Sequence, residues 1–584
     1  MEYDWRIYNK KADFKAMGER LGVDPVVVRV IRNRDVEDER GMERFLYGGE
    51  AELPDPKLLR GTDLGAEILE KKIREGKKLR IVSDYDVDGV TSCCILMDAL
   101  TRLGADVDYD IPDRIQDGYG INPRIVEKAA REGVDTIITC DNGIAALPAA
   151  ELAKEKGITY LVTDHHEPQE TLPPAAVLID PHLPGETTPY VEICGAVVAW
   201  KLVMVLAERM GKPFATDEYL DYLATATVCD VMPLLEENRI LVREGLRKLT
   251  ETRNTGFRAL ITATGLEGKT ISTYHLGFVI GPTINAMGRL GSAKRAVELL
   301  LTKDEEFAAE RAAEMKELND SRKSMTEAGV RRAEEMLKEP LDEVIVLHVP
   351  ELHESLAGIV AGRLKERYWR PVIILTDVSE KDKYPVKMYC GSARSIPGYN
   401  IFEKLSGVSE LMDHFGGHPA AAGLTIPAEN LEEFRTRLNR DTGIPPEMFR
   451  PRLMIDVPMP MEYAYMRLAE QLAALGPFGT GNEPPVFAER GMEVLGMRIF
   501  GKNRNVMSLR LKAASGRINE VLSFDPEGFQ KDIKVWFDDE KCDKIKSGIA
   551  SGVRLDVAYQ LEINEYNGTR SLRFMLKACR PSEA

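Results

Sequence analysis

The chain has 584 residues, a formal net charge of -16, 44% hydrophobic residues and 29% charged residues. This length predicts several domains, and the composition is that of a globular protein and excludes a disordered chain. The acidic balance argues against a surface that is basic all round, although a local basic groove for nucleic acid fits on an acidic body.

The eight cysteines include no Cys-x-x-Cys pair, which argues against a disulfide framework and against a cysteine-zinc site. The N-terminus, Met1 to Trp5, lacks a signal-peptide pattern, and no uncharged apolar run reaches membrane-spanning length. The sequence therefore predicts a cytoplasmic protein without a membrane partner.

The first part of the chain predicts a short segment followed by a parallel sheet. Residues 1–60 mix short helical patterns with charge, and we expect them to pack on the core that follows at 61–300. In that core apolar β runs alternate with helical spacing, which is typical of βαβ units. The β runs are 79–83, 106–111, 136–139, 159–163 and 176–179, and the helical segments are 91–103, 123–131 and 147–156.

The rest of the chain predicts more helices, a second α/β lobe and a β domain. Residues 193–250 have helical patterns that Val228–Pro233 interrupts, and the proline-free stretch in 301–340 predicts one or two long connecting helices, with a capping box formed by Thr302 and Glu305. A second α/β pattern occupies 341–442. Short strands fill 443–584, where Asn567-Gly568 predicts a hairpin turn, and we expect a small β-barrel.

Three carboxylates stand on alternate residues directly after an apolar β run. They are Asp84, Asp86 and Asp88. On an extended chain, alternate side chains point to one face, where three like charges need a cation to neutralise them. Carboxylate oxygens suit hard divalent metals, so this stretch predicts a metal site. The alternative is a solvated acidic turn that caps a helix.

Further acids and two adjacent histidines follow other predicted strands. Asp141 comes after one β run and Asp164-His165-His166 after the next, whereas Asp230 lies at a break between helices. Ligands of an open parallel sheet bind at the carboxyl ends of its strands, so these groups could converge on one crevice. Carboxylates with imidazole and no thiolate favour Mn²⁺ or Mg²⁺. Alone, the first acid could be a turn residue and the last a helix cap.

These motifs resemble the DHH phosphoesterase superfamily, and from end to end the chain resembles the bacterial RecJ family of single-strand-specific 5′→3′ exonucleases. The start, with Leu21–Pro25 and Phe45-Leu46, is similar to the N-terminal segment of that family, and His414–Gly423 in the second lobe is similar to its Gly-Gly-His motif. The resemblance implies a DHH core at 61–300, a Gly-Gly-His lobe at 341–442 and an OB-fold at 443–584.

The resemblance implies a two-metal centre and assigns its residues. Metal positions are Asp84, Asp86, Asp88, Asp141, His165 and Asp230, although direct binding by Asp88 is left open, and catalytic positions are Asp141, Asp164 and His166. His166 is expected at the scissile phosphate. Two divalent cations, Mn²⁺ as the first choice and Mg²⁺ as the alternative, would activate water and clamp the phosphodiester. Asn142 departs from relatives that often carry His there, which leaves its role open.

The resemblance also implies residues that hold the substrate. Phosphate contacts are assigned to Arg114, Asn285, Arg289, Ser392, Arg394, Gly417 and His418. Arginine suits this role because its planar fork matches a phosphate bidentately. In the β domain, Arg498, Lys502, Arg504, Arg510 and Lys512 surround Phe500, and basic residues with an aromatic suit a single strand on an OB-fold.

We therefore expect an exonuclease that removes 5′-mononucleotides from single-stranded DNA in repair and recombination. The expected partners are a single strand with a 5′ end and, by family resemblance, a single-strand-binding protein and a helicase, and we expect a monomer. Two alternatives stay open: a phosphoesterase for short oligoribonucleotides or signalling dinucleotides, and a non-catalytic DNA-binding scaffold. The intact acids and histidines favour catalysis over the scaffold, and the long C-terminal domain argues against the small-substrate enzymes.

Overall fold

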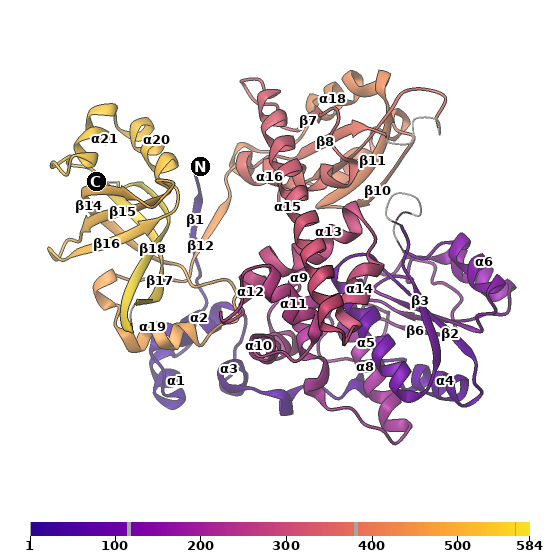
Figure 1. Cartoon of the computed structure of the whole chain (residues 1–584). Coiled ribbons are helices and arrows are strands. Elements are labelled where there is room, and N and C mark those ends of the chain that lie inside the picture. The colour runs from indigo at the N-terminus through magenta and orange to yellow at the C-terminus, as the bar shows by residue number, and fades with distance from the viewer. Residues whose placement is uncertain (1, 114–117, 119, 379–383, 567, 584) are drawn as a thin grey trace. The chain divides into compact units, whose positions relative to one another are not determined.

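The computed structural model describes residues 2–113, 118, 120–378, 384–566 and 568–583 (Figure 1). It divides into two compact units. One comprises Met1–Gly48, Gly443–Phe478 and Asn482–Ala584, and the other comprises Gly49–Thr442 and Gly479–Gly481. Among the described residues, no helix combines the length and the apolar character needed to cross a membrane.

A five-stranded parallel sheet forms the centre of the larger unit, as the alternating pattern predicts. Its strands are β2 (Lys78–Ser83), β3 (Asp106–Asp110), β4 (Thr136–Cys140), β5 (Thr159–Thr163) and β6 (Val177–Ile179), in the order β3-β2-β4-β5-β6. After β3 the chain returns to the other side of β2. The order of strands therefore reverses between β2 and β4, and a crevice is expected at their carboxyl ends.

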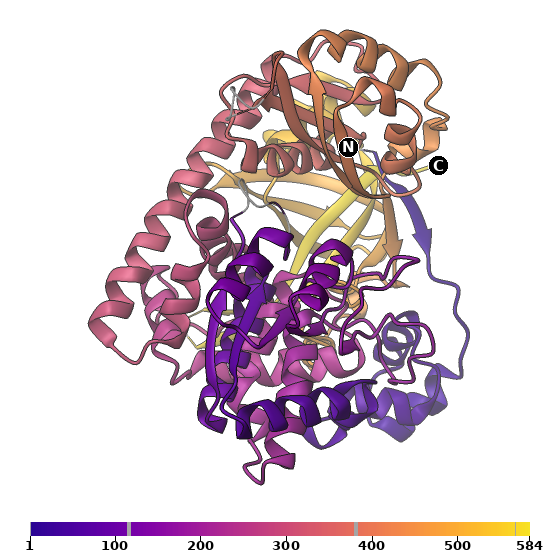
Figure 2. The same cartoon turned by 90° about the vertical axis from the view of Figure 1, so that its right-hand side faces the viewer.

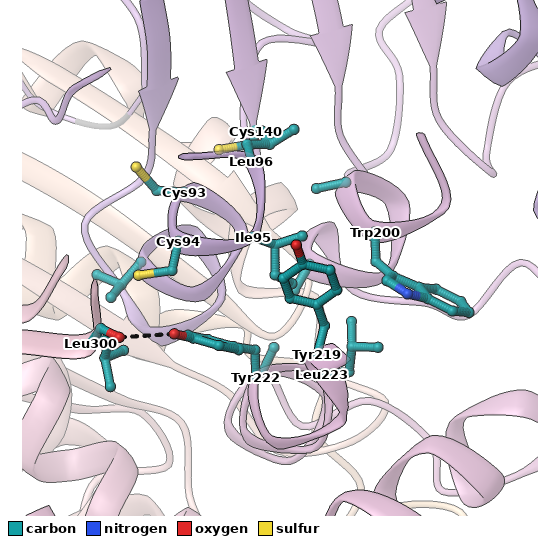
Figure 3. Packing of buried hydrophobic residues seen from close by; sticks show 14 of the residues in the cluster. Cys93, Cys94, Ile95, Leu96, Cys140, Trp200, Tyr219, Tyr222, Leu223 and Leu300 are labelled. Carbon is teal, nitrogen blue, oxygen red and sulfur yellow. Dashed lines mark hydrogen bonds between the residues drawn. The ribbon is translucent and has the colours of Figure 1, made fainter. Parts of the chain in front are cut away.

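Apolar side chains cover both faces of this sheet. Helices α6 (Pro123–Arg131) and α7 (Leu147–Glu155) pack on one face through residues such as Val126 and Ala150. Helices α4 (Thr62–Arg74), α5 (Val87–Leu103) and α8 (Gly195–Arg209) contribute to the core of the other face. Figure 3 shows part of that core, in which Cys93, Cys94 and Cys140 are buried as free thiols and the Tyr222 hydroxyl donates to the Leu300 carbonyl at 2.9 Å.

A layer of helices continues this second core. It consists of α9 (Leu220–Cys229), α10 (Glu236–Thr250), α11 (Thr255–Ala263), α12 (Thr273–His275), the π-helical turn η4 (Leu276–Ile280), α13 (Gly281–Leu290) and α14 (Lys294–Leu301). Lys201 of α8 and Glu237 of α10 form a completely buried ion pair, with Nζ and Oε2 2.8 Å apart. The predicted interruption at 228–233 is confirmed, because α9 ends at Cys229 and α10 begins at Glu236.

The connecting segment is a single long helix, α15 (Glu305–Glu335), visible along its length in Figure 2. The predicted capping box is wrong. The N-cap is Asp304, whose side chain accepts from the amides of Glu306 and Phe307. Thr302 instead accepts from the Asp304 amide, because it lies two residues before the N-cap.

The second α/β lobe is a mixed sheet in the order β10-β11-β9-β8-β7. Its strands are β7 (Ile345–His348), β8 (Val372–Asp377), β9 (Met388–Arg394), β10 (His414–His418) and β11 (Ala421–Pro427), and its helices are α16 (Ala357–Tyr368), α17 (Ile401–Ser406) and α18 (Leu431–Arg440). Only β7 and β8 pair in parallel, and the remaining neighbours are antiparallel.

The smaller unit contains the predicted β-barrel. Strands β14 (Phe487–Phe500), β15 (Val506–Lys512), β16 (Ile518–Ser523), β18 (Thr569–Pro581) and β17 (Arg554–Tyr566) pair in that order, and the pairing of β14 with β17 closes the ring. Strand β13 (Val457–Pro458) adds to β14, and α19 (Met466–Ala473), α20 (Pro526–Trp536) and α21 (Asp539–Lys546) complete the domain. Asn567 of the predicted hairpin turn lies outside the described residues.

The N-terminal segment contacts residues of the smaller unit. Strand β1 (Asp4–Ile7) pairs in parallel with β12 (Arg452–Ile455), and α1 (Phe14–Leu21), α2 (Pro25–Asn33) and α3 (Glu39–Tyr47) follow. Arg34 forms a buried ion pair with Asp456, with Nη1 and Oδ1 2.8 Å apart. Residues 1–48 therefore form one compact unit with the barrel domain, whereas the predicted boundary at residue 60 stays a prediction.

Candidate active site

The first acids lie where β2 meets α5. Strand β2 ends at Ser83, Asp84 follows, and the side chain of Asp86 caps α5 by accepting from the Gly89 amide at 3.1 Å. A Cβ at Gly89 would lie 2.3 Å from the Asp84 carbonyl oxygen, so glycine is needed for the helix to start against the strand end. The alternation argument fails for Asp88, because this residue already belongs to the first turn of α5.

Asp141 follows β4 in a strained backbone conformation. Its φ is 59°, which few residues other than glycine adopt. A Cβ at Gly195 would lie 2.8 Å from Asp141 Cβ and 3.1 Å from its Oδ1, so the start of α8 presses against this carboxylate. Its position is therefore determined by the end of β4 on one side and by the N-terminus of α8 on the other.

Asn142 has a structural role. Its side-chain oxygen accepts from the Ile121 amide, and its amide group donates to the carbonyls of Val82 and Cys140 at 3.1 and 2.9 Å. The side chain thus ties together β2, β4 and the segment before α6. Because these contacts occupy its acceptor and both its donors, we assign it to support of the crevice.

His165 stands among the carboxylates. Its Nε2 lies 3.1 Å from Asp141 Oδ1, 3.5 Å from Asp230 Oδ2 and 3.6 Å from Asp88 Oδ2. Asp230 reaches this point from the C-terminal end of α9. Three groups of side chains each offer ligand atoms within 4.8 Å of one another: Asp84, Asp86 and Asp141; Asp88, His165 and Asp230; and Asp141, His165 and His166. The structure therefore brings all the predicted metal positions into one acid cluster.

The cluster concentrates negative charge in a buried place. Burial and the charges of neighbouring carboxylates, Asp88 first, raise the pKa values of Asp86, Asp141 and Asp230. The pKa of Asp141 lies well above the usual range of a carboxyl group, and that of Asp230 reaches about 9. Burial also lowers the pKa of His165, which keeps its imidazole neutral and able to act as a ligand. Such a site favours whatever positive charge can enter it.

The donor set fits hard divalent cations. Carboxylate oxygens with one neutral imidazole are ligands of Mn²⁺ and Mg²⁺. The cysteines next to the cluster, Cys140, Cys194 and Cys229, have pKa values raised chiefly by burial and stay thiols. A cation would also remove the repulsion that raises the carboxyl pKa values. The residues present thus fit a divalent-metal site.

Asp88 is anchored to the protein backbone. Its Oδ2 accepts from the Gly195 amide at 2.6 Å and its Oδ1 from the Ala196 amide at 2.8 Å. Helix α8 has no side-chain cap of its own at Cys194, so the Asp88 carboxylate satisfies the first amides of that helix. We infer that Asp88 mainly holds α8 against the cluster.

Asp164 and His166 form a second pair beside the cluster. Asp164 Oδ1 lies 2.7 Å from His166 Nδ1, and Oδ2 accepts from the Ile144 amide. Burial opposes the charge of both groups, but the hydrogen bond between them outweighs it: the pKa of Asp164 is lowered, and that of His166 is raised to about 9. His166 is half exposed and cationic at neutral pH in the absence of metal, as a phosphate contact requires.

Three of the predicted phosphate contacts gather at the start of α16. Arg289 donates through Nη1 to the Ser355 carbonyl at 2.9 Å, just before that helix. Arg394 donates through Nη1 to Ser392 Oγ at 2.7 Å, and a Cβ at Gly358 would lie 2.7 Å from Arg394 Nη2. Two guanidinium groups, a hydroxyl and a helix N-terminus in one place make a suitable anion site.

The remaining predicted contacts have different positions. Asn285 lies one turn before Arg289 on α13 and is half buried. His418 and Arg394 share a row across β10, β11 and β9 through Ala421, so they lie on one face of the sheet. Gly417 precedes His418 on β10, so a side chain at this position would point to the opposite face of the sheet. Its φ is 152°, and a Cβ there would lie 2.6 Å from Ala422 Cα. Arg114 lies outside the described residues.

Exposed basic and aromatic side chains share a face of the barrel. The register pairs Arg498 with Ser508, Phe500 with Val506 and Gly496 with Arg510. Arg498, Phe500 and Arg510 therefore point to the same side of β14 and β15, and all three are exposed. This arrangement agrees with the pattern predicted from the sequence.

The sequence analysis missed several polar residues near the cluster. Asp180 directly follows β6 and is buried, with its pKa raised to about 7 chiefly by burial. It repeats the pattern of an acid after an apolar run, which could have identified it. A cavity of about 240 Å³ beside Tyr85 is lined by Asp110, Lys128 and Lys294, and the two lysines bind Asp110 at 2.8 and 2.6 Å. These charges come together only through folding.

Three family models match parts of the chain. The N-terminal domain of the DHH family matches residues 78–227, the DHHA1 domain matches 341–442, and the RecJ OB domain matches 455–578. The acid cluster, whose members follow β2, β4 and β5 or belong to the start of α5, lies inside the first match, apart from Asp230 just beyond it. The Gly-Gly-His strands lie inside the second match, and the barrel inside the third.

Relatives match almost the whole chain. The single-stranded-DNA-specific exonuclease RecJ of Bacillus subtilis is 34% identical over 99% of this chain and 71% of its own length. RecJ of Haemophilus influenzae is 31% identical over 97% of this chain and 98% of its own. The crystal structure of RecJ from Thermus thermophilus in complex with Mn²⁺ superposes with a TM-score of 0.82 at 29% identity, covering 99% of this chain and 80% of that one. The Mg²⁺ complex gives 0.77.

Proposed function

This chain belongs to the RecJ family, and from that premise we propose that it is a metal-dependent, single-stranded-DNA-specific 5′→3′ exonuclease that releases 5′-mononucleotides in DNA repair and recombination. The observation that carries the proposal is the acid cluster at the carboxyl ends of β2 and β4. His165 lies within 3.6 Å of carboxylate oxygens from three separate parts of the chain. The family resemblance supplies the substrate class and the polarity.

We assign the metal-holding role to Asp84, Asp86, Asp141, His165 and Asp230. Two divalent cations, Mn²⁺ first and Mg²⁺ second, fit these oxygen and imidazole donors, and both ions occur in the RecJ structures from Thermus thermophilus. When bound, the cations would lower the pKa of water to near ~7 and neutralise charge that develops on the phosphoryl group.

The remaining catalytic work falls to the pair of Asp164 and His166. The Asp164 carboxylate holds His166 Nδ1 at 2.7 Å, which leaves Nε2 as a donor toward a phosphate oxygen. Because the hydrogen bond keeps the imidazole protonated at neutral pH, it would bind the scissile phosphate as a cation and stabilise the extra negative charge of the transition state. Asp88 would keep α8, and with it Asp141, in position.

End recognition is assigned to the group of Arg289, Ser392 and Arg394 at the start of α16. A terminal phosphate carries more charge than an internal one, and two guanidinium forks with a helix N-terminus favour it. Asn285, Gly417, His418 and Arg114 keep their predicted roles in phosphate contact. The barrel face with Arg498, Phe500 and Arg510 would track the single strand beyond the site.

The decisive experiment compares 5′-labelled single strands, duplex DNA, short RNA and cyclic dinucleotides, each with Mn²⁺ or Mg²⁺. We expect labelled mononucleotide to appear first from the single strand and activity to vanish with a chelator. Asp141→Ala should abolish cleavage while leaving single-strand binding largely intact. Preferred hydrolysis of the dinucleotides, or undiminished turnover by the variant, would refute the proposal.

Salt dependence gives a second criterion, since phosphate contacts release counterions on binding and binding should weaken steeply as salt rises. A flat response would indicate a small-molecule substrate. The monomeric state, the cytoplasmic location and delivery of the substrate by a helicase or a single-strand-binding protein stay predictions.

A further inference from the structure

Two large aromatic rings stand exposed on the larger unit, and no step of the proposed reaction uses them. Tyr274 is 63% exposed and Phe278 is 67% exposed. Their ring centroids lie 5.1 Å apart with an interplanar angle of 26°, so the rings stack on each other. An aromatic side chain normally gains by burial, and a stacked pair left in solvent indicates a partner.

The backbone that carries these rings runs from α12 into a π-helical turn. Tyr274 belongs to α12 and Phe278 to η4, which continues directly into α13. Single π-helical turns inside α-helices occur frequently at functional sites. Here the rings point away from the core, whereas Leu276 and Ile280 of the same turn are completely buried.

This turn is attached to the end of α9, next to the acid cluster. The Cys229 thiol donates to the Leu276 carbonyl at 3.6 Å, and a Cβ at Gly281 would lie 2.4 Å from Cys229 Sγ. The residue that follows Cys229 is Asp230, whose carboxylate lies 3.5 Å from His165. Helix α9 contacts η4 directly, within the larger unit.

One exposed apolar side chain also adjoins the acid cluster. Val231, directly after Asp230, is 65% exposed and has a φ of 60°. A β-branched residue in the left-handed region is strained, and its side chain is turned outward at the rim of the site. Burial and the charge of Lys269 lower the pKa of His275, the neighbour of Tyr274 in the chain, so a cation is also close.

We propose that Tyr274 and Phe278 form a stacking platform for nucleobases of the single strand, beside the point of cleavage. The inference rests on the proposed function, because it needs a single strand whose phosphate sits at the acid cluster. A nucleobase is the occupant that fits: it offers a flat π-face, and the bases adjoining a bound phosphate must lie within a few ångströms of it. Each base can stack whatever its identity, so the platform serves an enzyme without sequence preference.

The platform differs from the barrel face around Phe500, which belongs to the other compact unit. The barrel would bind other nucleotides of the strand, whereas the platform would align the nucleotides nearest to the cut. Loss of the platform should therefore weaken binding of short oligonucleotides most, because long ones keep their contacts with the barrel.

The test uses full-length protein with Tyr274→Ala, Phe278→Ala, both together, or Phe278→Trp. Tyr47→Ala is the matched control, since Tyr47 is also 63% exposed but lies on α3. Binding of 5′-phosphorylated oligothymidylates is measured by fluorescence anisotropy in the presence of a chelator, which prevents cleavage. One set of oligonucleotides is intact, and another carries one abasic position that moves along the strand from the 5′ end.

We expect the double variant to bind a short intact strand about tenfold more weakly, which equals about 1.4 kcal/mol, with Phe278→Trp and Tyr47→Ala near the parent. The affinity of the parent should fall by a similar factor when one particular base near the 5′ end is missing. The affinity of the double variant should not change when that base is missing. Tryptophan fluorescence of Phe278→Trp should be quenched by the intact strand.

Equal affinities of the parent and the double variant would overturn the platform, as would an unchanged response to the abasic position. If the variant binds DNA normally but loses a protein partner, the surface is a protein-docking site and the proposal is wrong. Failure of the proposed function gives another result, because the parent itself would then show no single-strand binding or cleavage.

Discussion

Asp88→Asn tests whether this acid anchors a helix or binds metal directly. The substitution keeps the size of the side chain but leaves one acceptor oxygen where the carboxylate has two. In the native protein these oxygens accept from the Gly195 and Ala196 amides at 2.6 and 2.8 Å. A bond to an ionised acceptor contributes about 1.5–3 kcal/mol, and an amide left buried without an acceptor costs about 1–3 kcal/mol. We therefore expect a loss of ~3 kcal/mol when cations balance the cluster.

In the metal-free protein a second effect opposes this loss. Asp88 is the strongest of the neighbouring charges that raise the pKa values of Asp141 and Asp230. Two unit charges 4 Å apart repel by about 4 kcal/mol at an effective dielectric constant of 20, so removal of one charge gives relief of the same order. The two effects should nearly cancel, and the metal-free variant should be about as stable as the parent.

The assay is thermal unfolding of the parent and the variant, each with saturating Mn²⁺ and with a chelator. We expect the melting temperature of the variant to fall by several degrees with Mn²⁺ and to change little without it. Asp230→Asn is the control, because among the described residues its carboxylate accepts no backbone amide; it should weaken Mn²⁺ affinity and stabilise the metal-free form. The same loss of stability in both forms of Asp88→Asn, or none with Mn²⁺, would refute the reasoning.

Three further substitutions test other parts of the site and its support. Glu237→Gln should lower the free energy of unfolding in urea by about 3–5 kcal/mol, because it leaves the buried Lys201 ammonium unpaired. The double variant Glu237→Leu with Lys201→Met should recover most of that loss. Equal stability of the parent and the single variant would contradict this. Gly195→Ala should lower exonuclease activity at least tenfold with little change in melting temperature, since the added Cβ would lie 2.8 Å from Asp141 Cβ and displace the catalytic carboxylate. Full activity would show that α8 can shift to accommodate the methyl group. In metal-free protein, Asp164→Asn should return the pKa of His166 from about 9 toward its ordinary 6.5. The variant should therefore bind a single strand more weakly than the parent at pH 8 but equally at pH 6. If the ratio of the two affinities is the same at both pH values, His166 does not bind as a cation.

The acids that follow strands could be identified from the sequence because two regular patterns meet there. Apolar runs alternating with helical spacing predict parallel strands, and the carboxyl ends of parallel strands share one edge. Asp84, Asp141 and His165 follow such runs, so their convergence needed no knowledge of distant packing. Asp230 needed the family resemblance, because a residue at the end of a helix has no such rule.

The role of Asp88 could not be predicted, because the alternation argument assumes a chain that stays extended. The backbone enters α5 after Asp86, and the Asp88 carboxylate then meets amides more than a hundred residues later in the sequence. The stacked pair of Tyr274 and Phe278 was missed for the opposite reason. Apolar residues at helical spacing normally predict a buried face, and nothing local indicates that both rings face outward where α12 passes into a π-helical turn.

Local chemistry thus identifies which residues can bind a cation or a phosphate, because charge, donor type and strand position are legible in a few neighbouring residues. Which of them act together depends on contacts between distant segments. Arg289, Ser392 and Arg394 gather near residues 355–358, and the start of α8 presses on Asp141. Such contacts between distant segments depend on how the whole core packs, and no short stretch of residues encodes the shape of the whole core.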